Sequence, residues 1–538
     1  MKRLSNQDLA DNLEETGELY ASQGVQFKPR AYERAAAEVA SFGRNVADLY
    51  KDKGERGLRE IPGVGPGIAK HLAQLLKTGK FAEHEKLRKA APIKMRELTR
   101  IEHVGPKTAL ELYRKAGVRS VADLRKAVAS GKLRKAGFSA KMEAKIAKGL
   151  EFLKTSGDRK ILGFILPTAL KMEEAIGALP GVKRAAMTGS IRRRQETIGD
   201  LDFIATASDA EKTMKAFAAL PEARETIAFG RGMSTIRLAN GMHADLMVVP
   251  DDAYGAILHH FTGGKDHNIQ LRLLAKKKGL KLDEFGLFRG KKRIAARTEE
   301  EIYAKLGLPF IEPELRTGEG EIEAALADRL PKLIPYGSIR GDLQVQTSWT
   351  DGEASIEKMA EEAKKLGLDY MAVTDHTKRL TMMGGLDEKR LAAQGREIDK
   401  INAKMRGFTI LKGSECDILK DGSMDLDDDA LASLDFVGAS IHSFFNLSGA
   451  EQTARMIAAM KNPHVDCIFH PTGRKINSRP PYDLDILAVL KAAKATGTAM
   501  EIDAYPDRSD LRDEHVRMAV KLGVKLLIDT DAHHPSHL

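Results

Sequence analysis

The sequence TGSIRR at residues 188–193, followed by GDLDF at residues 199–203, determines how the central part of this chain folds. The apolar residues around the second segment indicate a β-strand. Because residues two apart on a strand point to the same face, Asp200 and Asp202 are expected to project together. Two like charges on one face repel each other unless a cation lies between them. Carboxylate oxygens are the ligands that suit Mg²⁺ or Mn²⁺.

A second strand pattern, HADLMVV at residues 243–249, supplies a third carboxylate, Asp245. The Gly-Ser turn of the first segment has basic residues behind it, which is typical of a turn that holds a polyphosphate. Three acidic groups beside a phosphate-binding turn are what two-metal phosphoryl transfer requires. The sequence therefore predicts a nucleotidyl transferase in which the three aspartates are catalytic and bind the metal ions.

The composition narrows the possible classes of protein. With 538 residues, of which 42% are hydrophobic, the chain is expected to form three or four domains. Its two cysteines, Cys416 and Cys467, argue against a disulfide framework, and the net charge of +10 favours a polyanionic partner. There is no apolar run as long as a membrane span, and residues 1–5 do not resemble a secretory segment. We expect a cytoplasmic protein without membrane contact.

Two glycine-rich turns repeat in the first part of the chain, IPGVGPGIA at residues 61–69 and IEHVGPKTA at residues 101–109, and a weaker copy lies at residues 136–141. Glycine lets another backbone approach closely, and the N–H groups that begin the following helix can take a phosphate. A single copy is equally consistent with a simple helix corner. Two copies, next to a segment (131–160) with nine basic and three acidic residues, predict helix-hairpin-helix binding of the DNA backbone. The predicted DNA-binding residues are Gly63, Gly65, Gly67, Gly105 and Lys107.

After residue 341 the pattern changes to alternating strands and helices, which predicts an α/β barrel. The expected strands are 370–374, 408–411, 436–439, 467–469, 499–502 and 525–528. Histidines and acids follow these strands, where barrel active sites gather. They are Asp375, His376, Glu415, His442, His470, Asp531 and His533. One such histidine is more often a structural hydrogen-bonding group, but five strand-end sites together indicate a metal cluster.

With hairpins, Gly-Ser turn and aspartates in this order, the chain resembles the family X DNA polymerases, the group that contains DNA polymerase beta, over roughly its first 320 residues. The resemblance implies an α+β multidomain fold: helical helix-hairpin-helix domains, then a nucleotidyltransferase palm and a thumb. It implies gapped or primer-template DNA and dNTPs as substrates, with Mg²⁺ or Mn²⁺ in the palm. It also implies that Phe261 and its turn crowd a ribose 2′-OH. The nucleotide-binding residues implied are Gly189, Ser190, Arg193, Gly199, Phe261, Gly263, Lys265, Asn268 and Arg272.

The chain departs from polymerase beta at several of these positions. Ile198 stands where that protein has a serine on the triphosphate, and His260 replaces a tyrosine. Lys265 occupies an acidic position, and our hypothesis is that this cation grips the nucleotide phosphates before DNA binds. At the position of the Schiff-base lysine of the 5′-deoxyribose phosphate lyase the chain has His71, with Lys70 beside it. Imidazole cannot form the imine, so we expect no efficient lyase of that type.

The C-terminal part resembles the polymerase and histidinol phosphatase (PHP) domain, which is fused to bacterial family X polymerases. The resemblance implies a trinuclear site with Zn²⁺ or Mn²⁺ and a 3′–5′ exonuclease. The family's opening motif is Asp-Leu-His-x-His, whereas this chain has DLQVQ at residues 342–346, with Gln344 and Gln346 in place of imidazoles. The family barrel normally continues for about another helix beyond the position of Leu538.

A carboxamide oxygen is a poorer ligand for these ions than imidazole. The implied metal positions retain Glu415 and Asp531 in the first; Glu415, His442 and His470 in the second; and Asp351, His376 and His533 in the third. We therefore expect incomplete metal occupancy and a weakened exonuclease.

The pattern divides the chain into six parts. We expect an 8-kDa-like helical domain (1–85), a fingers-like domain (86–160), the palm (161–255), the thumb (256–317), a linker (318–340) and the PHP domain (341–538).

We expect a monomeric, template-dependent DNA polymerase that fills short gaps in base excision or end-joining repair. Three alternatives stay open. The main activity could be that of a DNA-docked PHP exonuclease or phosphatase. The chain could be a DNA-bridging scaffold with two decayed sites, although an isolated acidic trio has no structural benefit. It could also be a template-independent transferase.

Overall fold

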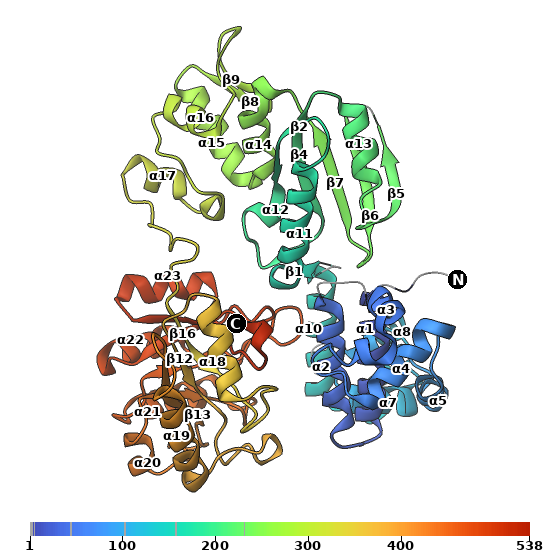
Figure 1. The fold of residues 1–538 in the computed structure, drawn as a ribbon, viewed down its shortest axis with the longest axis vertical. Helices are drawn as coiled ribbons and strands as arrows, with labels where there is room; N and C mark the ends of the chain where they lie inside the picture. Colours follow the sequence, from blue (N-terminus) through green and yellow to red (C-terminus); the bar gives the residue numbers. More distant parts are fainter. Residues whose placement is uncertain are drawn as a thin grey trace. The chain divides into compact units, whose positions relative to one another are not determined.

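The computed structural model describes residues 4, 6–42, 46–99, 101, 104–156, 159–230 and 232–538, and it separates into two compact units, Met1–Leu333 and Ile334–Leu538 (Figure 1). Glu102 and His103 of the second hairpin motif, and Met1–Arg3 and Ser5 of the N-terminal stretch, lie outside the described residues. Among the described residues, no helix is both long enough and apolar enough to cross a membrane.

The described residues up to Ser156 are mainly helical and share one apolar core. The helices are α1 (Asn6–Ser22), α2 (Lys28–Ser41), α3 (Val46–Leu58), α4 (Pro66–Thr78), α5 (Ala82–Ala90), α6 (Met95–Thr99), α7 (Pro106–Ala116), α8 (Val121–Ala129), α9 (Lys132–Lys135) and α10 (Ala140–Ser156).

The two strong hairpin motifs adopt the same local geometry. Gly65 precedes α4 with φ −72° and ψ 174°, and Gly105 precedes α7 with φ −72° and ψ 172°. A proline follows each glycine at the first helical position, where the missing N–H costs nothing. Gly63 has φ +69°, a conformation that favours glycine. A Cβ added at Gly65 or Gly105 would meet no described atom within 4 Å, so packing within the described chain does not require these two glycines.

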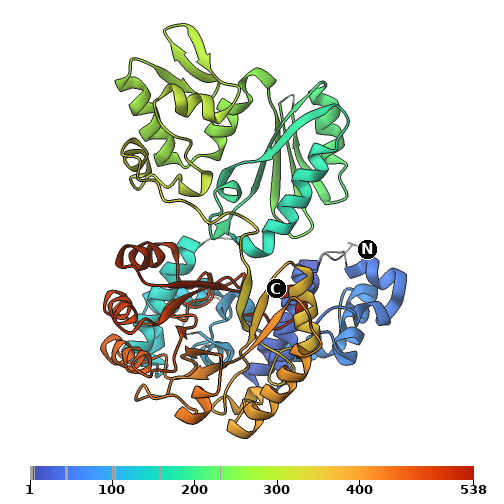
Figure 2. The same ribbon diagram turned by 60° about the vertical axis from the view of Figure 1, so that its left-hand side comes forward.

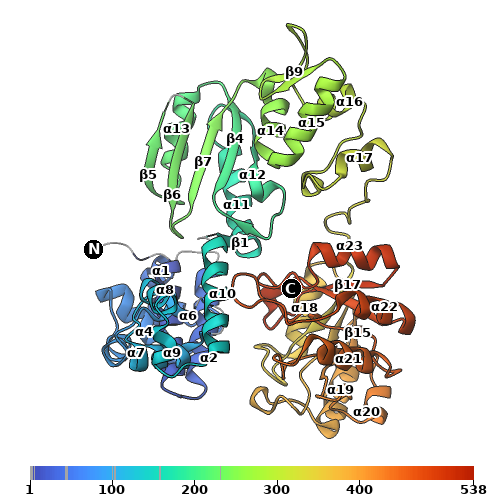
Figure 3. The same cartoon turned by 180° about the vertical axis from the view of Figure 1, so that it is seen from behind.

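The palm is built on a mixed sheet of five described strands in the order β2-β4-β7-β6-β5, with α11 and α13 packed against it (Figures 1 and 3). Strands β4 and β7 run parallel, and their register places Asp202 beside Asp245. The elements are β1 (Lys160–Ile161), α11 (Leu162–Gly177), β2 (Val182–Met187), α12 (Gly189–Arg192), β3 (Thr197–Ile198), β4 (Leu201–Ala207), α13 (Ala210–Ala218), β5 (Ala223–Phe229), β6 (Met233–Leu238) and β7 (His243–Val248).

In the thumb, α14 packs against α16, and the antiparallel sheet β10-β9-β8 contacts α14, α15 and α16. A Cβ on Gly255 would lie 2.2 Å from the Cα of Thr298, so only glycine lets α14 approach the start of α16 this closely. The Thr298 side chain caps α16. The elements are η1 (Asp251–Ala253), α14 (Tyr254–Thr262), α15 (Lys265–Lys277), β8 (Lys281–Asp283), β9 (Gly286–Arg289), β10 (Lys292–Ala295), α16 (Glu299–Lys305), η2 (Pro313–Leu315) and α17 (Glu321–Leu326).

The second unit is the predicted barrel. Its seven described strands are parallel and follow chain order, and a bridge between Val345 and Ala532 brings the first strand to the last. Helices lie outside the sheet, those in gold on one side and those in red on the other (Figure 2). The elements are β11 (Gly341–Val345), α18 (Ile356–Lys365), β12 (Tyr370–Val373), η3 (Thr381–Met383), α19 (Glu388–Asn402), β13 (Thr409–Asp417), α20 (Asp428–Ala432), β14 (Phe436–Ser440), α21 (Gly449–Met460), β15 (Cys467–Ile468), α22 (Ile486–Thr496), β16 (Ala499–Asp503), α23 (Asp513–Leu522), β17 (Leu526–Asp529) and η4 (Pro535–His537).

All six strands expected from the pattern are present; five agree with the expected bounds to within one residue at each end, and β13 runs six residues further than expected, to Asp417. Strand β14 is buried along its whole length, as expected when helices cover a parallel sheet. Because the strands are parallel, the side chains that follow them meet at one end of the barrel.

Candidate active sites

The three predicted aspartates converge in the palm. Carboxylate oxygens of Asp200, Asp202 and Asp245 lie within 4.8 Å of one another. Asp200 precedes β4, Asp202 is the second residue of that strand, and Asp245 lies on the parallel neighbour β7. The register of two adjacent strands thus assembles a site whose members are 45 residues apart in sequence, Asp200 to Asp245.

The three carboxylates carry like charges in close proximity, an arrangement that a bound cation would stabilise. Burial, together with the charges of Asp200 and Asp245, raises the pKa of Asp202 to about 6. The Oδ1 atom of Asp245 is buried and has no hydrogen-bond partner among the described residues. An all-oxygen donor set with an unpartnered buried acceptor fits Mg²⁺ or Mn²⁺.

The Gly-Ser turn lies directly against this group. Gly189 has φ +59°, and a Cβ there would lie 2.4 Å from Oδ2 of Asp202. Only glycine therefore fits between the turn and the carboxylates. Ser190 follows it in the short helix α12, and Gly199 immediately precedes Asp200. Sequence and packing agree that this turn and the acidic group form one site.

Arg193 links the Gly-Ser turn to the predicted sugar turn of the thumb. Its guanidinium donates to the carbonyl of Thr262, and a Cβ on Gly263 would lie 3.0 Å from its Nη1. Gly263 has φ +72° and ends α14. The structure thus brings the residues implied for the triphosphate and those implied for the sugar into direct contact.

The other predicted nucleotide-binding residues lie around the end of α14 and along α15. Asn268 donates to the carbonyl of His260 over 2.9 Å, and Arg272 donates to Nδ1 of His260 over 2.9 Å. Burial and the charge of Arg272 lower the pKa of His260, so the ring stays neutral and accepts this bond. The ring of Phe261 is 39% exposed, and Lys265 is exposed at the first position of α15.

Sequence reasoning missed a buried ion-pair triad behind this site. Glu299 accepts from Arg192 over 2.6 Å and from Arg316 over 2.6 Å, and the side chain of Arg316 has no exposed surface. Arg192 also donates to Oγ1 of Thr262 over 2.5 Å. The triad therefore joins α12 of the palm to α16 and to the end of the thumb. No local pattern signals it, because its members are more than 100 residues apart at the extremes.

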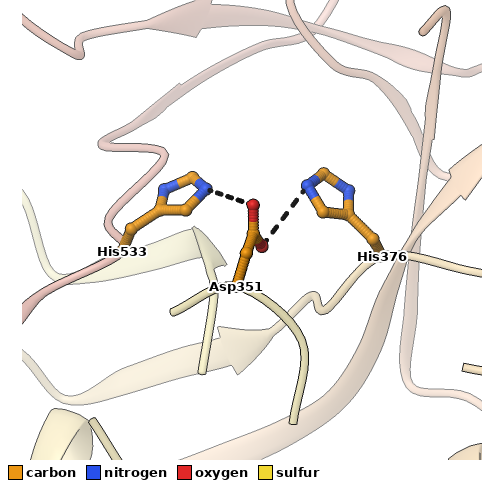
Figure 4. A group of neighbouring side chains, drawn as sticks. All are labelled: Asp351, His376 and His533. Atoms are coloured by element: carbon orange, nitrogen blue, oxygen red, sulfur yellow. Dashed lines mark ion pairs between the residues drawn. The ribbon is translucent and has the colours of Figure 1, made fainter. Parts of the chain in front are cut away.

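In the barrel, Asp351 lies between two imidazoles (Figure 4). One carboxylate oxygen is 3.6 Å from Nε2 of His376 and the other is 3.7 Å from Nε2 of His533. The three ligand atoms lie within 4.8 Å of one another. This set has the chemistry of a zinc or manganese site.

Glu415 is the centre of a second group. His470 contacts its Oε1 over 2.7 Å, His442 contacts the same oxygen over 3.0 Å, and His376 contacts its Oε2 over 3.1 Å. His376, Glu415 and His442 have ligand atoms within 4.8 Å of one another. His376 belongs to both groups, through Nδ1 here and Nε2 toward Asp351.

The buried charges of this second group shift the pKa values of its members in opposite directions. Burial alone would raise the pKa of Glu415, but the charges and hydrogen bonds of His376 and His442 hold that pKa well below its usual range. Burial alone would lower the pKa of His442, but Glu415 and Asp417 raise it to about 10. Burial lowers the pKa of His470 to about 4. A metal ion would replace the protons on these rings.

The third implied metal position, around Gln344, Gln346 and Asp531, has amide side chains where the family has imidazoles. Gln346 turns its amide NH₂ toward Glu415 and donates to Oε2 over 2.8 Å. Both side-chain polar atoms of Gln344 are buried without a partner among the described residues. Asp531 lies 3.6 Å from Nη2 of Arg508, a residue that sequence reasoning missed. This set fits a third metal ion less well than the other two groups fit theirs, because carboxamides replace two imidazoles and a guanidinium pairs with the carboxylate.

Comparison with known proteins covers nearly the whole chain. Four family descriptions match: "Helix-hairpin-helix domain" over residues 4–81, "SAM-like Helix-hairpin-helix tandem" over 95–151, "DNA polymerase beta thumb" over 257–317 and "PHP domain" over 342–470.

One curated relative matches nearly the whole chain, and others match only a part of it. The chain is 37% identical over 512 residues to "DNA polymerase/3'-5' exonuclease PolX" of Bacillus subtilis, an alignment that covers 94% of this chain and 88% of that protein. It is 26% identical to DNA polymerase lambda of Arabidopsis thaliana, over 55% of this chain and 59% of that protein. It is 34% identical to a probable phosphatase of Caldicellulosiruptor saccharolyticus, over 33% of this chain and 73% of that protein.

The similarity to the Bacillus protein is high enough and long enough to show the family, and it confirms the resemblance drawn from the motifs. The chain belongs to the bacterial PolX group of family X DNA polymerases, with helix-hairpin-helix domains, a polymerase beta thumb and a C-terminal PHP domain.

Proposed function

We propose that this chain is a template-dependent DNA polymerase that fills short gaps during base excision or end-joining repair, acting as a monomer. It would transfer a nucleotide from a dNTP to the primer 3′-OH and release pyrophosphate. The observation that carries the proposal is the palm site: three converging carboxylates lie against a turn that only glycine can form.

Asp200, Asp202 and Asp245 would hold two Mg²⁺ or Mn²⁺ ions. When bound, such ions neutralise phosphate charge and lower the pKa of a hydroxyl. Asp245 would also orient the primer 3′-OH and accept its proton through Oδ1, the atom left without a partner. The charge that the three carboxylates place in one spot is what selects a divalent cation there.

The triphosphate would lie along the Gly-Ser turn. Backbone N–H groups at Gly189 and Ser190 and the guanidinium of Arg193 would bind its oxygens, with Gly199 leaving room beside Asp200. Lys265 would add a cation at the start of α15. Because Arg193 also contacts Thr262, binding of the triphosphate would be coupled to the position of the sugar turn.

The sugar and base would be held by the thumb. Phe261 and the backbone at Gly263 would crowd a ribose 2′-OH and so favour deoxynucleotides. Asn268 and Arg272 would approach the minor-groove edge of the new base pair. Their hydrogen bonds to His260 fix both side chains before the nucleotide binds.

The hairpin residues Gly63, Gly65, Gly67, Gly105 and Lys107 would bind the DNA backbone. The repeated geometry of the two hairpins supports this role, since each ends in a glycine followed by the N-terminus of a helix. Contacts of this kind position the duplex without reading its sequence.

An efficient 5′-deoxyribose phosphate lyase is not part of the proposal. His71 lies in α4, where its Nδ1 is 2.5 Å from the hydroxyl of Tyr32, and burial lowers its pKa. The ring is a neutral partner of a tyrosine and carries no amine that could form an imine.

For the barrel we propose a 3′–5′ exonuclease that is weaker than a complete PHP site would give. Two groups, one around Asp351 and one around Glu415, fit Zn²⁺ or Mn²⁺. The third, around Gln344, Gln346 and Asp531, fits less well, so we expect incomplete occupancy. The two retained groups are the reason to keep a nuclease or phosphatase as a second activity.

The six-part division into residues 1–85, 86–160, 161–255, 256–317, 318–340 and 341–538 belongs to the same proposal. The boundary between the two compact units, at residue 333, falls inside the proposed linker, and Ile322 and Ala325 of α17 pack in the thumb core.

Primer extension on a one-nucleotide gap tests the proposal. The reaction holds Mg²⁺ or Mn²⁺ and each dNTP in turn, beside a lane without dNTP and a lane with the primer alone. We expect addition of the templated nucleotide only, and Asp245→Ala should abolish it while leaving DNA binding nearly intact. Addition to the lone primer would instead show a template-independent transferase, and shortening without extension would move the function to the barrel. Retained synthesis in Asp245→Ala would remove the assignment of the metal ligands.

A further inference from the structure

Two large aromatic rings are exposed on the loop that follows β14. Phe444 is 38% exposed and Phe445 is 36% exposed. Burying such a ring stabilises a fold, so two rings exposed in succession forgo that contribution. Neither ring has a role in the sites described above.

The backbone under these rings is fixed by two buried polar side chains. Arg455, which is 2% exposed, donates to the carbonyls of Ile418, Leu419 and Ser443, and Gln452, which is fully buried, donates to the carbonyl of Phe444 over 2.8 Å. Burying a guanidinium whose bonds are to neutral carbonyls is costly. These bonds hold the backbone beneath the two rings in place.

Cations lie beside both rings, and the buried guanidinium of Arg455 is 5.7 Å from the centre of the Phe444 ring. The guanidinium of Arg379 lies 5.4 Å from the centre of the Phe444 ring, and Nζ of Lys420 lies 6.0 Å from it. The guanidinium of Arg479 lies 5.0 Å from the centre of the Phe445 ring. Aromatic faces interleaved with Arg and Lys are what single-stranded nucleic acid binds, because bases stack on the rings and phosphates contact the cations.

The rings are connected to the Glu415 group through a short chain of contacts. Nε of Arg379, beside Phe444, is 3.4 Å from Oδ2 of Asp417. Oδ1 of Asp417 accepts from the backbone N–H of His442 over 3.1 Å, and His442 contacts Glu415. The aromatic pair therefore lies close to the candidate metal groups.

We propose that Phe444, Phe445, Arg379, Lys420 and Arg479 form a platform for the unpaired end of a DNA strand, and that this platform binds without any metal ion. The terminal bases stack on the two phenyl rings, and the adjoining phosphates contact the three cations. A duplex end is a poorer occupant, because its bases already stack on one another. The inference rests on the proposed function only in taking DNA as the polymer.

The test uses the full chain in EDTA and a thymidine oligonucleotide of about 12 residues with 2-aminopurine at its 3′ end. An excess of unlabelled gapped duplex occupies the polymerase half. Stacking of the terminal base quenches its fluorescence. We expect quenching with the wild type and with Phe444→Trp. In Phe444→Leu/Phe445→Leu, the apparent Kd should rise at least about tenfold, since both base–ring stacks are lost.

Leu366→Ala is the matched control. Leu366 is an exposed apolar residue of the same barrel (56% exposed), and its side chain has no aromatic face on which a base could stack. It should leave quenching unchanged, and Arg379→Gln should lower the slope of log Kd against log salt by about one. Circular dichroism and thermal unfolding show that the leucine variant is folded. Equal quenching in the leucine variant and the wild type, or an equal loss in Leu366→Ala, would overturn the platform. Primer extension is read separately, so failure of the polymerase proposal would be seen there and not in this assay.

Discussion

Replacing Glu299 with glutamine should loosen the junction between palm and thumb. Glu299 is 4% exposed and binds two guanidiniums, of which Arg316 has no exposed surface and Arg192 has 20%. Removing one member of a buried ion pair costs about 3–5 kcal/mol, because the remaining charge is left uncompensated. Arg316 keeps its bond to the carbonyl of Ile311, and Arg192 stays partly solvated, so we expect a value near the low end, about 3 kcal/mol.

Native-state hydrogen exchange, read by mass spectrometry, locates this loss. A decrease of about 3 kcal/mol in the free energy of opening makes the amides of α16 exchange roughly a hundredfold faster. The control is Glu300→Gln, the exposed neighbour on the same helix, which should change exchange little. Primer extension should show a higher KM for dNTP in Glu299→Gln, because Arg192 also contacts Thr262 of the sugar turn. Exchange within threefold of the Glu300→Gln value would refute the idea that the triad holds the two parts together.

Three further outcomes are expected. Because the pKa of Asp202 is raised to about 6, a proton competes with the metal below that pH: palm affinity for Mn²⁺ should fall about tenfold per pH unit below 6 and be constant above about 7. Titration with Mn²⁺, followed by electron paramagnetic resonance, checks this. The Mn²⁺ bound by Asp245→Ala is subtracted as the contribution of the barrel, and a pH-independent affinity would contradict the prediction. Binding of gapped DNA should weaken steeply with salt, and Lys107→Gln should lower the slope by about one; a flat salt response would remove the backbone-contact account of the hairpins. Restoring histidine at Gln344 and Gln346 should raise both the bound metal per chain and the exonuclease rate, whereas no gain in either would point to the pairing of Arg508 with Asp531 as the obstacle.

Much of the molecule could be read from local pattern, and the reason is physical. The common orientation of Asp200 and Asp202 could be predicted because side chains two apart on a strand point to the same face. Gly65 and Gly105 could be recognised as turn residues because each precedes a proline at a helix start. The barrel strands are recognisable since a parallel sheet covered by helices needs continuous apolar runs.

What sequence could not supply depends on contacts between distant segments. Glu299 sits in an ordinary acidic run, Glu299–Glu301, and nothing in that run distinguishes the residue that is buried from its exposed neighbour. Arg508 looks like any surface arginine until the fold places it beside Asp531. The sequence shows that Gln344 and Gln346 depart from the family motif. Only the structure shows that Gln346 donates to Glu415 and that the Gln344 side chain has no partner among the described residues.

His376 has a consequence for how the barrel can be loaded. A neutral imidazole has one nitrogen lone pair to give, yet this ring faces Asp351 with Nε2 and Glu415 with Nδ1. An ion that takes the lone pair on one side leaves an N–H pointing at the other, where it becomes a donor to a carboxylate instead of a ligand. An ion in the Asp351 group therefore needs the tautomer with the N–H on Nδ1, and the Glu415 group must then be completed by His442 and His470.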